Sequence, residues 1–457
     1  MVQSFRDTVA QLEAQGEVQR IFRTVDPRYE LSAVMTVLDR EKVVYFERVA
    51  GYEMPVVGNL LGSRVRIARL LDVDPPGVER RLEEAIDKPL APQTVKESPC
   101  QEIVRAEQVN VLEQLPVPTF FEREQGPYVT AGVVVAKHPI TGKRNISINR
   151  FQVLGPDRLV IGMAPTHHLR QLLDKARELG HPLEIAVCIG NHPAVLLASN
   201  YYVKLGHDEY DIAGSLLGEP LRITKGVSVD VEVPAEAEVV LEGIISGDEL
   251  VEEGFVSEFH GLYENYGKSP VFKVQAITRR ADAIFQVINP GYHAEHLLIG
   301  AVCIGATTLH AVKRAVPGAR SVVIPLGGGG RLHAIIALHE RPAGEARKAL
   351  FAAFAHCNLL KHVVVVDDDI DITDPEQVEW AIATRMRGDR DIVVIPGVKA
   401  DRAEPLEEEL TVSKVGIIAL KQPTGSRQDF TLARVPDGVM ERVRREWSTY
   451  TDKDTPL

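Results

Sequence analysis

Apolar and polar positions follow both helical and strand periods in the first hundred residues. A helical period covers residues 4–14, where Ser4 can cap the first turn. Strand-like EVQRIF, helical ELSAVMTVLDRE and the strand VVYFERV follow, and residues 63–88 return to a helical pattern. This alternation predicts an N-terminal α/β domain over residues 1–100.

The central part of the chain has the period of short strands. Runs such as YVTAGVVVAKH, NISINRFQVL, LEIAVCIG, AVLLASN and AEVVLEGIIS are separated by turn residues, and residues 167–179 are the one clear helical interruption. Many short strands with turns between them are typical of a barrel-like or split β domain. We therefore expect a central split β-barrel over residues 101–295.

Helix and strand alternate again in the last third. HAEHLLIGAVCIGATTLHAVKRAV and residues 343–358 have a helical pattern, and HVVVVD is an apolar strand of the buried parallel kind. A helix from Pro375 to Thr384 and the strand DIVVIPG follow, and we expect the polar tail after about residue 435 to pack as a helix or arm. The predicted fold class is α/β (α+β multidomain), with a C-terminal α/β domain over residues 296–457.

Composition narrows the class of protein. The chain has 457 residues, is 45% hydrophobic and carries a formal net charge of −12, which argues against a nucleic-acid binder. No stretch of eighteen apolar residues and no signal-peptide core over residues 1–30 is evident, so we expect a cytoplasmic protein without a membrane span. Its four cysteines lie far apart without a C-x-x-C motif, which indicates neither a zinc knuckle nor a disulfide framework.

Four polar residues form a candidate metal-binding set. Asn145 lies in the strand RNISINRFQV, the pair His167–His168 opens a helix, and Glu219 lies in LLGEPL. Each has a plain structural alternative: an edge-strand amide, a helix-capping histidine or a loop acid. Together, an amide oxygen, an imidazole and a carboxylate suit Mn²⁺ or Mg²⁺ better than a soft metal.

Two further stretches carry candidate chemistry. In EEGFVSEFHG, Glu253 and Glu258 lie among aromatic residues, where a raised carboxyl pKa and general-acid work are expected. A surface loop with scattered acids is the alternative. In IPLGGGGRLHA, four glycines let backbone approach a ligand and Arg331 can bind an anion, unless the segment is only a flexible connection. For the aspartates at 367–371 we favour a solvated loop over a Mg²⁺ site.

Taken in order along the chain, these motifs resemble the UbiD family of reversible decarboxylases, which use prenylated FMN. The resemblance covers nearly the whole chain. It is carried by SFRDTVAQLEAQGEVQRI, VVYFERVAGYEMPVVGNLLGS, GPYVTAGVVVAKHPITGKRNISINRFQV, VPAEAEVVLEGIIS and VVVVDDDIDITDPEQVEWAIATR. It implies that the central domain binds flavin, that the C-terminal domain mediates oligomerisation, and that the aspartate run has no catalytic role.

The resemblance also assigns roles to residues of this chain. It implies a divalent metal, usually Mn²⁺, that grips the flavin phosphate, with K⁺ nearby; its ligands fall on Asn145, His168 and Glu219. His167 and Lys414 would also contact the cofactor. The catalytic set falls on Arg150, Glu253 and Glu258. Arg150 would bind the substrate carboxylate, Glu258 would deliver the proton that replaces CO₂, and Glu253 would hold Arg150.

One geometric expectation follows from these roles. Asn145 and Arg150 are an odd number of residues apart, so a regular strand would place them on opposite faces. If one site uses both, a bulge or a strand end lies between them.

The substrate is expected to be an aromatic or heteroaromatic carboxylate. His296 and Arg331 could together bind a second anionic group, which makes 2,5-furandicarboxylate, giving 2-furoate and CO₂, the best-fitting family substrate. Furoate, pyrrole carboxylate and hydroxybenzoate remain open, as does a packing role for His296. The family also implies a flavin prenyltransferase that supplies the cofactor and a homo-oligomer, dimer or hexamer. An FMN-dependent oxidoreductase and a non-catalytic family member acting in assembly are the alternatives.

Overall fold

The first hundred residues form a small sheet covered by helices. The computed structural model describes residues 3–339, 344–422 and 433–450. The side chain of Ser4 accepts the N–H of Asp7 and starts the first helix, as its sequence position predicts. The helices are α1 Phe5–Ala14, α2 Glu30–Val37, α3 Arg64–Leu70 and α4 Val78–Asp87. The sheet has the order β1-β2-β3-β16, from β1 Val18–Ile21, β2 Val43–Phe46, β3 Val56–Gly58 and β16 Phe285–Gln286.

The central part closes into a barrel of six strands. The sheet order is β12-β9-β6-β7-β8-β15-β5, and β12 also pairs with β15, so six of these strands form a ring and β5 is added outside it. Closure removes the exposed strand edges that an open sheet would have. The strands are β5 Ile103–Arg105, β6 Tyr128–Lys137, β7 Arg144–Val153, β8 Arg158–Ile161, β9 Leu183–Ile189, β12 Val239–Glu252 and β15 Lys268–Arg279.

Shorter elements surround the barrel. Helix α6, His168–Glu178, buries Leu169, Leu172 and Leu173 in the same apolar cluster as the strands, which fixes the start of the helix beside β7. The other elements are β4 Gln93–Thr94, α5 Val111–Gln114, α7 Pro193–Ala198, α8 Glu209–Leu217, β10 Arg222–Lys225, β11 Glu232–Pro234, β13 Phe255–Ser257 and β14 Tyr263–Asn265.

The segment AVLLASN, expected as a strand, is a helix. Pro193 occupies the first turn of α7, and the side chain of His192 accepts the N–H of Ala194 as an N-cap. Every residue of α7 is buried. A short apolar run has no period that separates a buried strand from a buried helix, so the capping signals were the information that decided it.

The C-terminal part is a five-stranded sheet with helices. Its order is β17-β18-β19-β21-β20, and the helices predicted from the sequence are present. The elements are α9 Ala294–Ala315, β17 Ala319–Val323, β18 His333–Leu338, α10 Glu345–His356, β19 His362–Asp367, α11 Pro375–Arg385, β20 Ile392–Lys399, β21 Thr411–Ala419 and α12 Asp437–Arg445. No residue of α12 is buried. The multidomain fold of mixed helix and strand agrees with the expected class.

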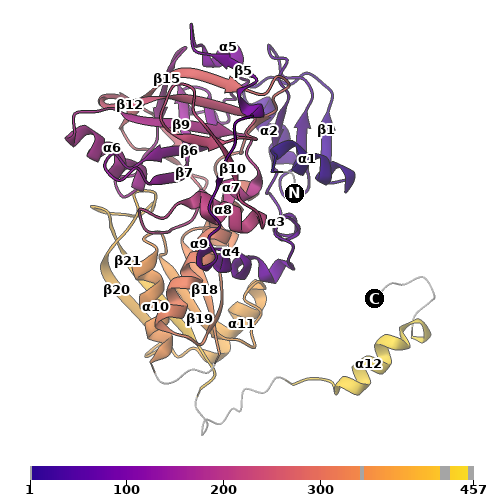
Figure 1. Cartoon of the computed structure of the whole chain (residues 1–457). Coiled ribbons are helices and arrows are strands. Elements are labelled where there is room, and N and C mark those ends of the chain that lie inside the picture. The colour runs from indigo at the N-terminus through magenta and orange to yellow at the C-terminus, as the bar shows by residue number, and fades with distance from the viewer. Residues whose placement is uncertain (1–2, 340–343, 423–432, 451–457) are drawn as a thin grey trace.

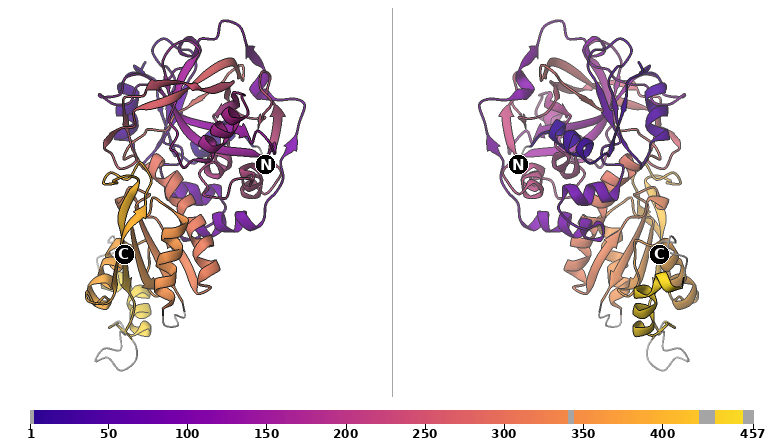
Figure 2. Two further views of the ribbon diagram at one scale, coloured as in Figure 1. Left: turned by 90° about the vertical axis from the view of Figure 1, so that its left-hand side faces the viewer. Right: turned by 90° about the vertical axis from the view of Figure 1, so that its right-hand side faces the viewer.

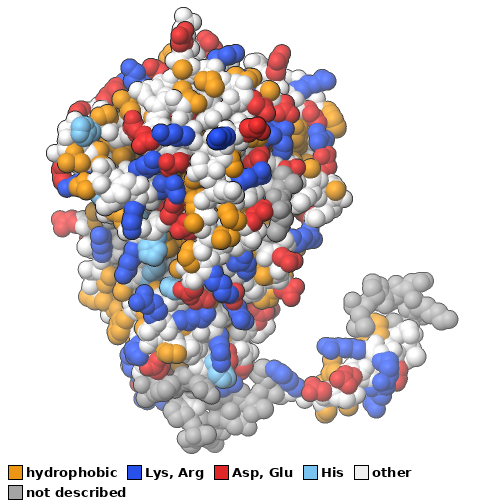
Figure 3. Space-filling view, viewed as in Figure 1, with side chains coloured by type: hydrophobic (Ala, Val, Ile, Leu, Met, Phe, Trp, Pro, Cys, Tyr) orange, Lys and Arg blue, Asp and Glu red, His pale blue; other side chains and the backbone are white. Residues whose placement is uncertain are grey.

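Helix α9 joins the two lobes seen in Figures 1 and 2. Its residues belong to the apolar cluster shared with the outer face of the barrel and to the cluster beneath the C-terminal sheet. The helix is long and apolar enough to cross a membrane by length and composition, but 83% of that window is buried in the protein, as in a core helix. On the face shown in Figure 3, acidic and basic side chains are interspersed rather than gathered by sign.

The β6–β7 ladder is irregular next to Arg150. Val129 pairs with Phe151 and Gly132 pairs with Asn149, so two residues of β6, Thr130 and Ala131, face Arg150 alone. The expected bulge or strand end in β7 between Asn145 and Arg150 is absent, because β7 is continuous and paired in register from Asn145 to Asn149; the irregularity lies in β6, opposite Arg150. A bulge locally increases twist and re-aims the side chain opposite it.

Barrel closure gives a stability prediction at Gly243, where the β12–β15 register shifts. A Cβ at Gly243 would lie 2.0 Å from the carbonyl oxygen of Lys273, which is backbone and cannot rotate away. We expect Gly243→Ala to lower the free energy of unfolding by about 2–3 kcal/mol, measured by chemical denaturation. Gly155→Ala is the matched control, because nothing lies within 4 Å of its added Cβ. Equal stability of the two variants would contradict the packing argument.

Candidate active site

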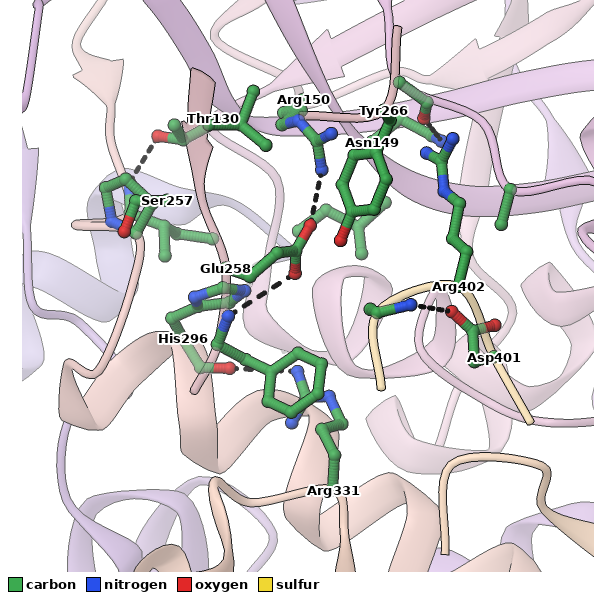
Figure 4. Close-up of a pocket in the computed structure, with 18 of the residues that line it drawn as sticks. Thr130, Asn149, Arg150, Ser257, Glu258, Tyr266, His296, Arg331, Asp401 and Arg402 are labelled. Carbon is green, nitrogen blue, oxygen red and sulfur yellow. Dashed lines mark hydrogen bonds and ion pairs between the residues drawn. The ribbon is translucent and has the colours of Figure 1, made fainter. Parts of the chain in front are cut away.

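A cavity of about 220 Å³ lies between the barrel and the C-terminal part of the chain. Strand β7 contributes Asn149 and Arg150, the segment after β13 contributes Glu258, and α9 and the glycine-rich loop contribute His296 and Arg331 (Figure 4). The cavity thus gathers residues that are far apart in the sequence.

Arg150 holds two carboxylates at one side of this cavity. Its Nε donates to Oε1 of Glu253 at 2.8 Å, its Nη2 donates to Oε2 of the same residue at 3.2 Å, and its Nη1 donates to Oε1 of Glu258 at 2.9 Å. Glu253 is completely buried, so the two-pronged pair fixes the guanidinium in one plane. The structure brings together all three residues expected to be catalytic.

The expected raised pKa of Glu258 is not found. Burial alone would raise the pKa of Glu258, but the positive charge of Arg150, with smaller effects of His296 and Tyr266, lowers it below the ordinary value. The sequence showed aromatic neighbours of Glu258 but no charged partner, so burial was expected to dominate its pKa. The ion pair with Arg150, which the sequence does not show, reverses the direction.

Residues that sequence reasoning missed complete this cavity. Tyr266, which follows β14, and Asp401 and Arg402, which lie between β20 and β21, all line it. The guanidinium carbons of Arg150 and Arg402 lie 5.4 and 4.1 Å from the centroid of the Tyr266 ring. No motif marks these three residues. Tyr266 comes from the turn between β14 and β15, and Asp401 and Arg402 meet the site only through the packing of the C-terminal part of the chain against the barrel.

A second cavity, of about 740 Å³, adjoins the first. The two share lining residues, namely Ile148, His167, Asn200, Tyr202, Arg331, Leu359 and Asp401. Asn145, His168 and Glu209 line the second cavity. His167 therefore lies where the two cavities meet, between the candidate metal ligands and the catalytic residues.

Asn145, His168 and Glu209 are suited to hold a divalent cation. Asn145 Nδ2 donates to Glu209 Oε1 at 3.1 Å and lies 3.5 Å from Nδ1 of His168. Asn145 Oδ1 is buried and has no hydrogen-bond partner among the described residues. Burial raises the pKa of Glu209 to about 8 and lowers that of His168, which favours the neutral imidazole that binds metals. A buried unpaired oxygen beside a buried carboxylate and an imidazole is a donor set for Mn²⁺ or Mg²⁺.

The structure places Glu209, and not the predicted Glu219, beside Asn145 and His168. Glu209 is the first residue of α8 and also accepts the N–H of Ile146 in β7 at 2.9 Å. Glu219 lies beyond Gly218, the C-cap at the other end of this helix of 9 residues, which is about 14 Å long, and it lines neither cavity. In the sequence, Glu209 has the pattern of an ordinary acid in the first turn of a helix, which concealed its role.

Lys414 is not placed to contact a ligand in either cavity. It lies on β21, is fully buried, and donates to the carbonyl oxygen of Asn358 at 3.0 Å. Asn358 lines the second cavity, so Lys414 supports that wall from behind. The sequence pattern VSKVG located the lysine on a strand but could not tell which face of the C-terminal sheet it would occupy.

His296 and Arg331 both line the first cavity. His296 Nδ1 lies 3.0 Å from the carbonyl oxygen of Gly291, and burial lowers its pKa to about 4. Arg331 donates to the carbonyl oxygens of Leu297 and Gly330, each at 3.0 Å, and of His296 at 3.1 Å. The two residues are adjacent, as a shared anion site requires, but much of the Arg331 guanidinium is already engaged.

Comparison with known proteins identifies the family. Models of the N-terminal, Rift-related and C-terminal domains of 3-octaprenyl-4-hydroxybenzoate carboxy-lyase, UbiD, match residues 9–86, 93–293 and 297–419. The chain belongs to the UbiD family. It is a UbiD-like enzyme of the decarboxylating class.

Curated and solved relatives cover almost the whole chain. The anhydromevalonate phosphate decarboxylases of Methanothermobacter thermautotrophicus and Methanosarcina mazei are each 35% identical, over 89% and 95% of this chain and 94% and 100% of theirs. The UbiD-class enzyme HmfF from Pelotomaculum thermopropionicum, solved with FMN, is 40% identical with a TM-score of 0.90 over 96% of this chain and 98% of that one. The vanillic acid decarboxylase of Sedimentibacter hydroxybenzoicus in closed form is 28% identical, with a TM-score of 0.89 over 99% and 100%.

The corrected ligand set gives a direct prediction. We expect Glu209→Gln to weaken Mn²⁺ binding about tenfold or more, because the amide loses the negative charge that faces the cation. Glu219→Gln is the control and is expected to keep wild-type affinity. Mn²⁺ binding in the presence of FMN can be followed by the electron paramagnetic resonance signal of free Mn²⁺. Loss of binding in the Glu219 variant alone would restore the original assignment.

Proposed function

We propose that this enzyme catalyses the reversible, non-oxidative decarboxylation of an aromatic or heteroaromatic carboxylic acid with prenylated FMN. The observation that carries the proposal is the Arg150–Glu253–Glu258 ion-pair network facing a cavity that adjoins the Asn145, His168 and Glu209 cluster. One cavity would hold the reacting acid, and the other would hold the phosphate end of the flavin.

The proposed cofactor is supported by relatives and by the donor set. HmfF has been solved with FMN, and an evolved dimeric form of it with prenylated FMN. In this chain Asn145, His168 and Glu209 would bind Mn²⁺ or Mg²⁺, and the metal would neutralise the phosphate. When bound, the prenylated flavin supplies the electrophilic carbon that accepts the electrons left by CO₂.

The protein's own residues orient the acid and move the proton. Arg150 would bind the substrate carboxylate and stay charged throughout, because an arginine does not lose its proton in proteins. Glu253, buried and bonded to two guanidinium nitrogens, keeps Arg150 in place. Glu258 would deliver a proton to the carbon that loses CO₂, and would remove one in the reverse direction.

The low pKa of Glu258 fits this cycle if substrate binding changes it. The charge of Arg150 favours the ionised form of Glu258. A substrate carboxylate on Arg150 would offset that charge, so the pKa of Glu258 would rise and the group could take a proton from solvent. Binding of the substrate would then allow Glu258 to become protonated, as a general acid must be.

For the substrate we propose a small acid with a second anionic group, with 2,5-furandicarboxylate as the first choice. Cationic side chains other than Arg150 support this. Arg402 lines the same small cavity, as do His296 and Arg331, although backbone carbonyl oxygens engage much of the Arg331 guanidinium. The second candidate is a phosphate-bearing acid, because several curated relatives are anhydromevalonate phosphate decarboxylases. Bound K⁺, a cytoplasmic location, a prenyltransferase that supplies the cofactor and a homo-oligomer remain predictions.

The cofactor is tested by its mass. We expect protein co-expressed with a flavin prenyltransferase to release a compound with the mass of prenylated FMN, and to turn over a heteroaromatic acid from a panel that includes 2,5-furandicarboxylate. Release of plain FMN together with oxidation of NADPH would instead favour an oxidoreductase.

The proton donor is tested by Glu258→Gln. The amide keeps the shape of the side chain but carries no transferable proton, so turnover is expected to fall about a thousandfold while prenylated FMN stays bound. Glu252→Gln, at an exposed position in the same segment, is the matched control and is expected to keep wild-type turnover. Full activity of the Glu258 variant would remove the residue from the mechanism.

A further inference from the structure

Arg402 is a cation of the C-terminal part of the chain that reaches into the first cavity. It lies between β20 and β21, and Figure 4 shows its side chain beside Tyr266, with Arg150 on the other side of the ring. Its guanidinium carbon is 4.1 Å from the ring centroid of Tyr266. The segment that carries it is held by Asp401, whose carboxylate accepts the N–H of Ala403 at 3.0 Å.

The charge of Arg402 has no paired counter-charge among the described residues. In the part of the chain that the structure describes, its guanidinium makes no hydrogen bond and no ion pair, and its close contact is the Tyr266 ring. The carboxylates that influence it, Glu253 and Glu258, are already bound by Arg150. Burial and the like charge of Arg150 lower the pKa of Arg402, so its charge is held at a cost that an anionic ligand would relieve.

Arg331, unlike Arg402, has hydrogen-bond partners in the protein. It donates to three backbone carbonyl oxygens, those of Leu297, Gly330 and His296. Its guanidinium fits over Gly300 of α9 so closely that a Cβ there would lie 1.9 Å from the guanidinium carbon. Arg331 therefore joins the glycine-rich loop to α9, and few of its donors remain for a substrate.

We infer that Arg402 binds the second anionic group of the substrate, a carboxylate or a phosphate, and so determines which acids the enzyme accepts. The inference rests on the proposed function, in which Arg150 takes the carboxylate that leaves. Arg150 and Arg402 flank the same tyrosine ring, so an acid with two anionic groups could engage both guanidinium groups in one cavity. The planar fork of an arginine suits either anion.

The experiment measures binding rather than turnover. The affinities of FMN-loaded protein for 2,5-furandicarboxylate, anhydromevalonate phosphate and 2-furoate are determined by calorimetry for the wild type, Arg402→Gln and Arg402→Lys. We expect Arg402→Gln to weaken binding of a doubly anionic acid about tenfold or more and to change 2-furoate binding less than about twofold. Arg402→Lys should recover part of the loss. Whichever dianion loses affinity identifies the carboxylate or the phosphate as the natural group.

Controls separate the possible explanations. Arg390→Gln removes an exposed arginine of the same sheet, which pairs with Asp389, and should leave all three affinities unchanged. Arg331→Gln should lower the thermal unfolding temperature and weaken all three acids alike. Equal weakening of 2-furoate and the dianions in Arg402→Gln, or a wild type with no preference for a dianion, would overturn the inference. If the enzyme bound dianions selectively but did not decarboxylate any of them when loaded with prenylated FMN, the proposed reaction would be wrong and the role of Arg402 would stand.

Discussion

The buried ion pairs of Arg150 are the interaction on which the site depends. Removing one partner of a buried pair leaves an uncompensated charge, which costs about 3–5 kcal/mol. Glu253 comes from the end of β12 and Glu258 from the segment after β13, so Arg150 ties two turns of the chain to the barrel wall. Gly254, with φ of +78°, lies between them in a backbone conformation that side-chain-bearing residues rarely adopt, so a substitution there would be strained.

The barrel presents Arg150 through its local irregularity. Thr130, in the bulge of β6, faces Arg150 and accepts the N–H of Ile288 through its hydroxyl at 3.0 Å, which ties the bulge to the segment before α9. On the other side, α6 packs its leucines in the barrel core and so fixes His167 and His168 at its first turn. One strand, β7, therefore serves both cavities: Asn145 near its beginning lines one, and Arg150 further along lines the other.

The sequence predicts features that depend on neighbouring residues better than features that depend on tertiary packing. Period, caps and turn residues predicted the longer helices and most strands, but not α7 and α8. The resemblance to a family pointed to Asn145, Arg150, His168, Glu253 and Glu258, which the structure gathers around two adjoining cavities. Glu219 was chosen over Glu209 because both are acids at the ends of α8, and only tertiary packing decides which end meets β7. The prediction of a raised pKa for Glu258 was wrong for a similar reason, because its ion-pair partner Arg150 is 108 residues away in the sequence.

Three arginines line the first cavity, and their contacts differ. Arg150 belongs to the barrel and is fixed by two glutamates, so it cannot be altered without disturbing the proposed chemistry. Arg331 donates hydrogen bonds to backbone carbonyl oxygens and so holds the glycine-rich loop on α9. Arg402 lies on the connection between β20 and β21 and lines the cavity beside the Tyr266 ring, and among the described residues it has no hydrogen bond or ion pair. A connection of this kind tolerates substitution far better than a barrel strand. Recognition of the substrate's far end can therefore change within a family while the residues that hold the reacting carboxylate stay as they are.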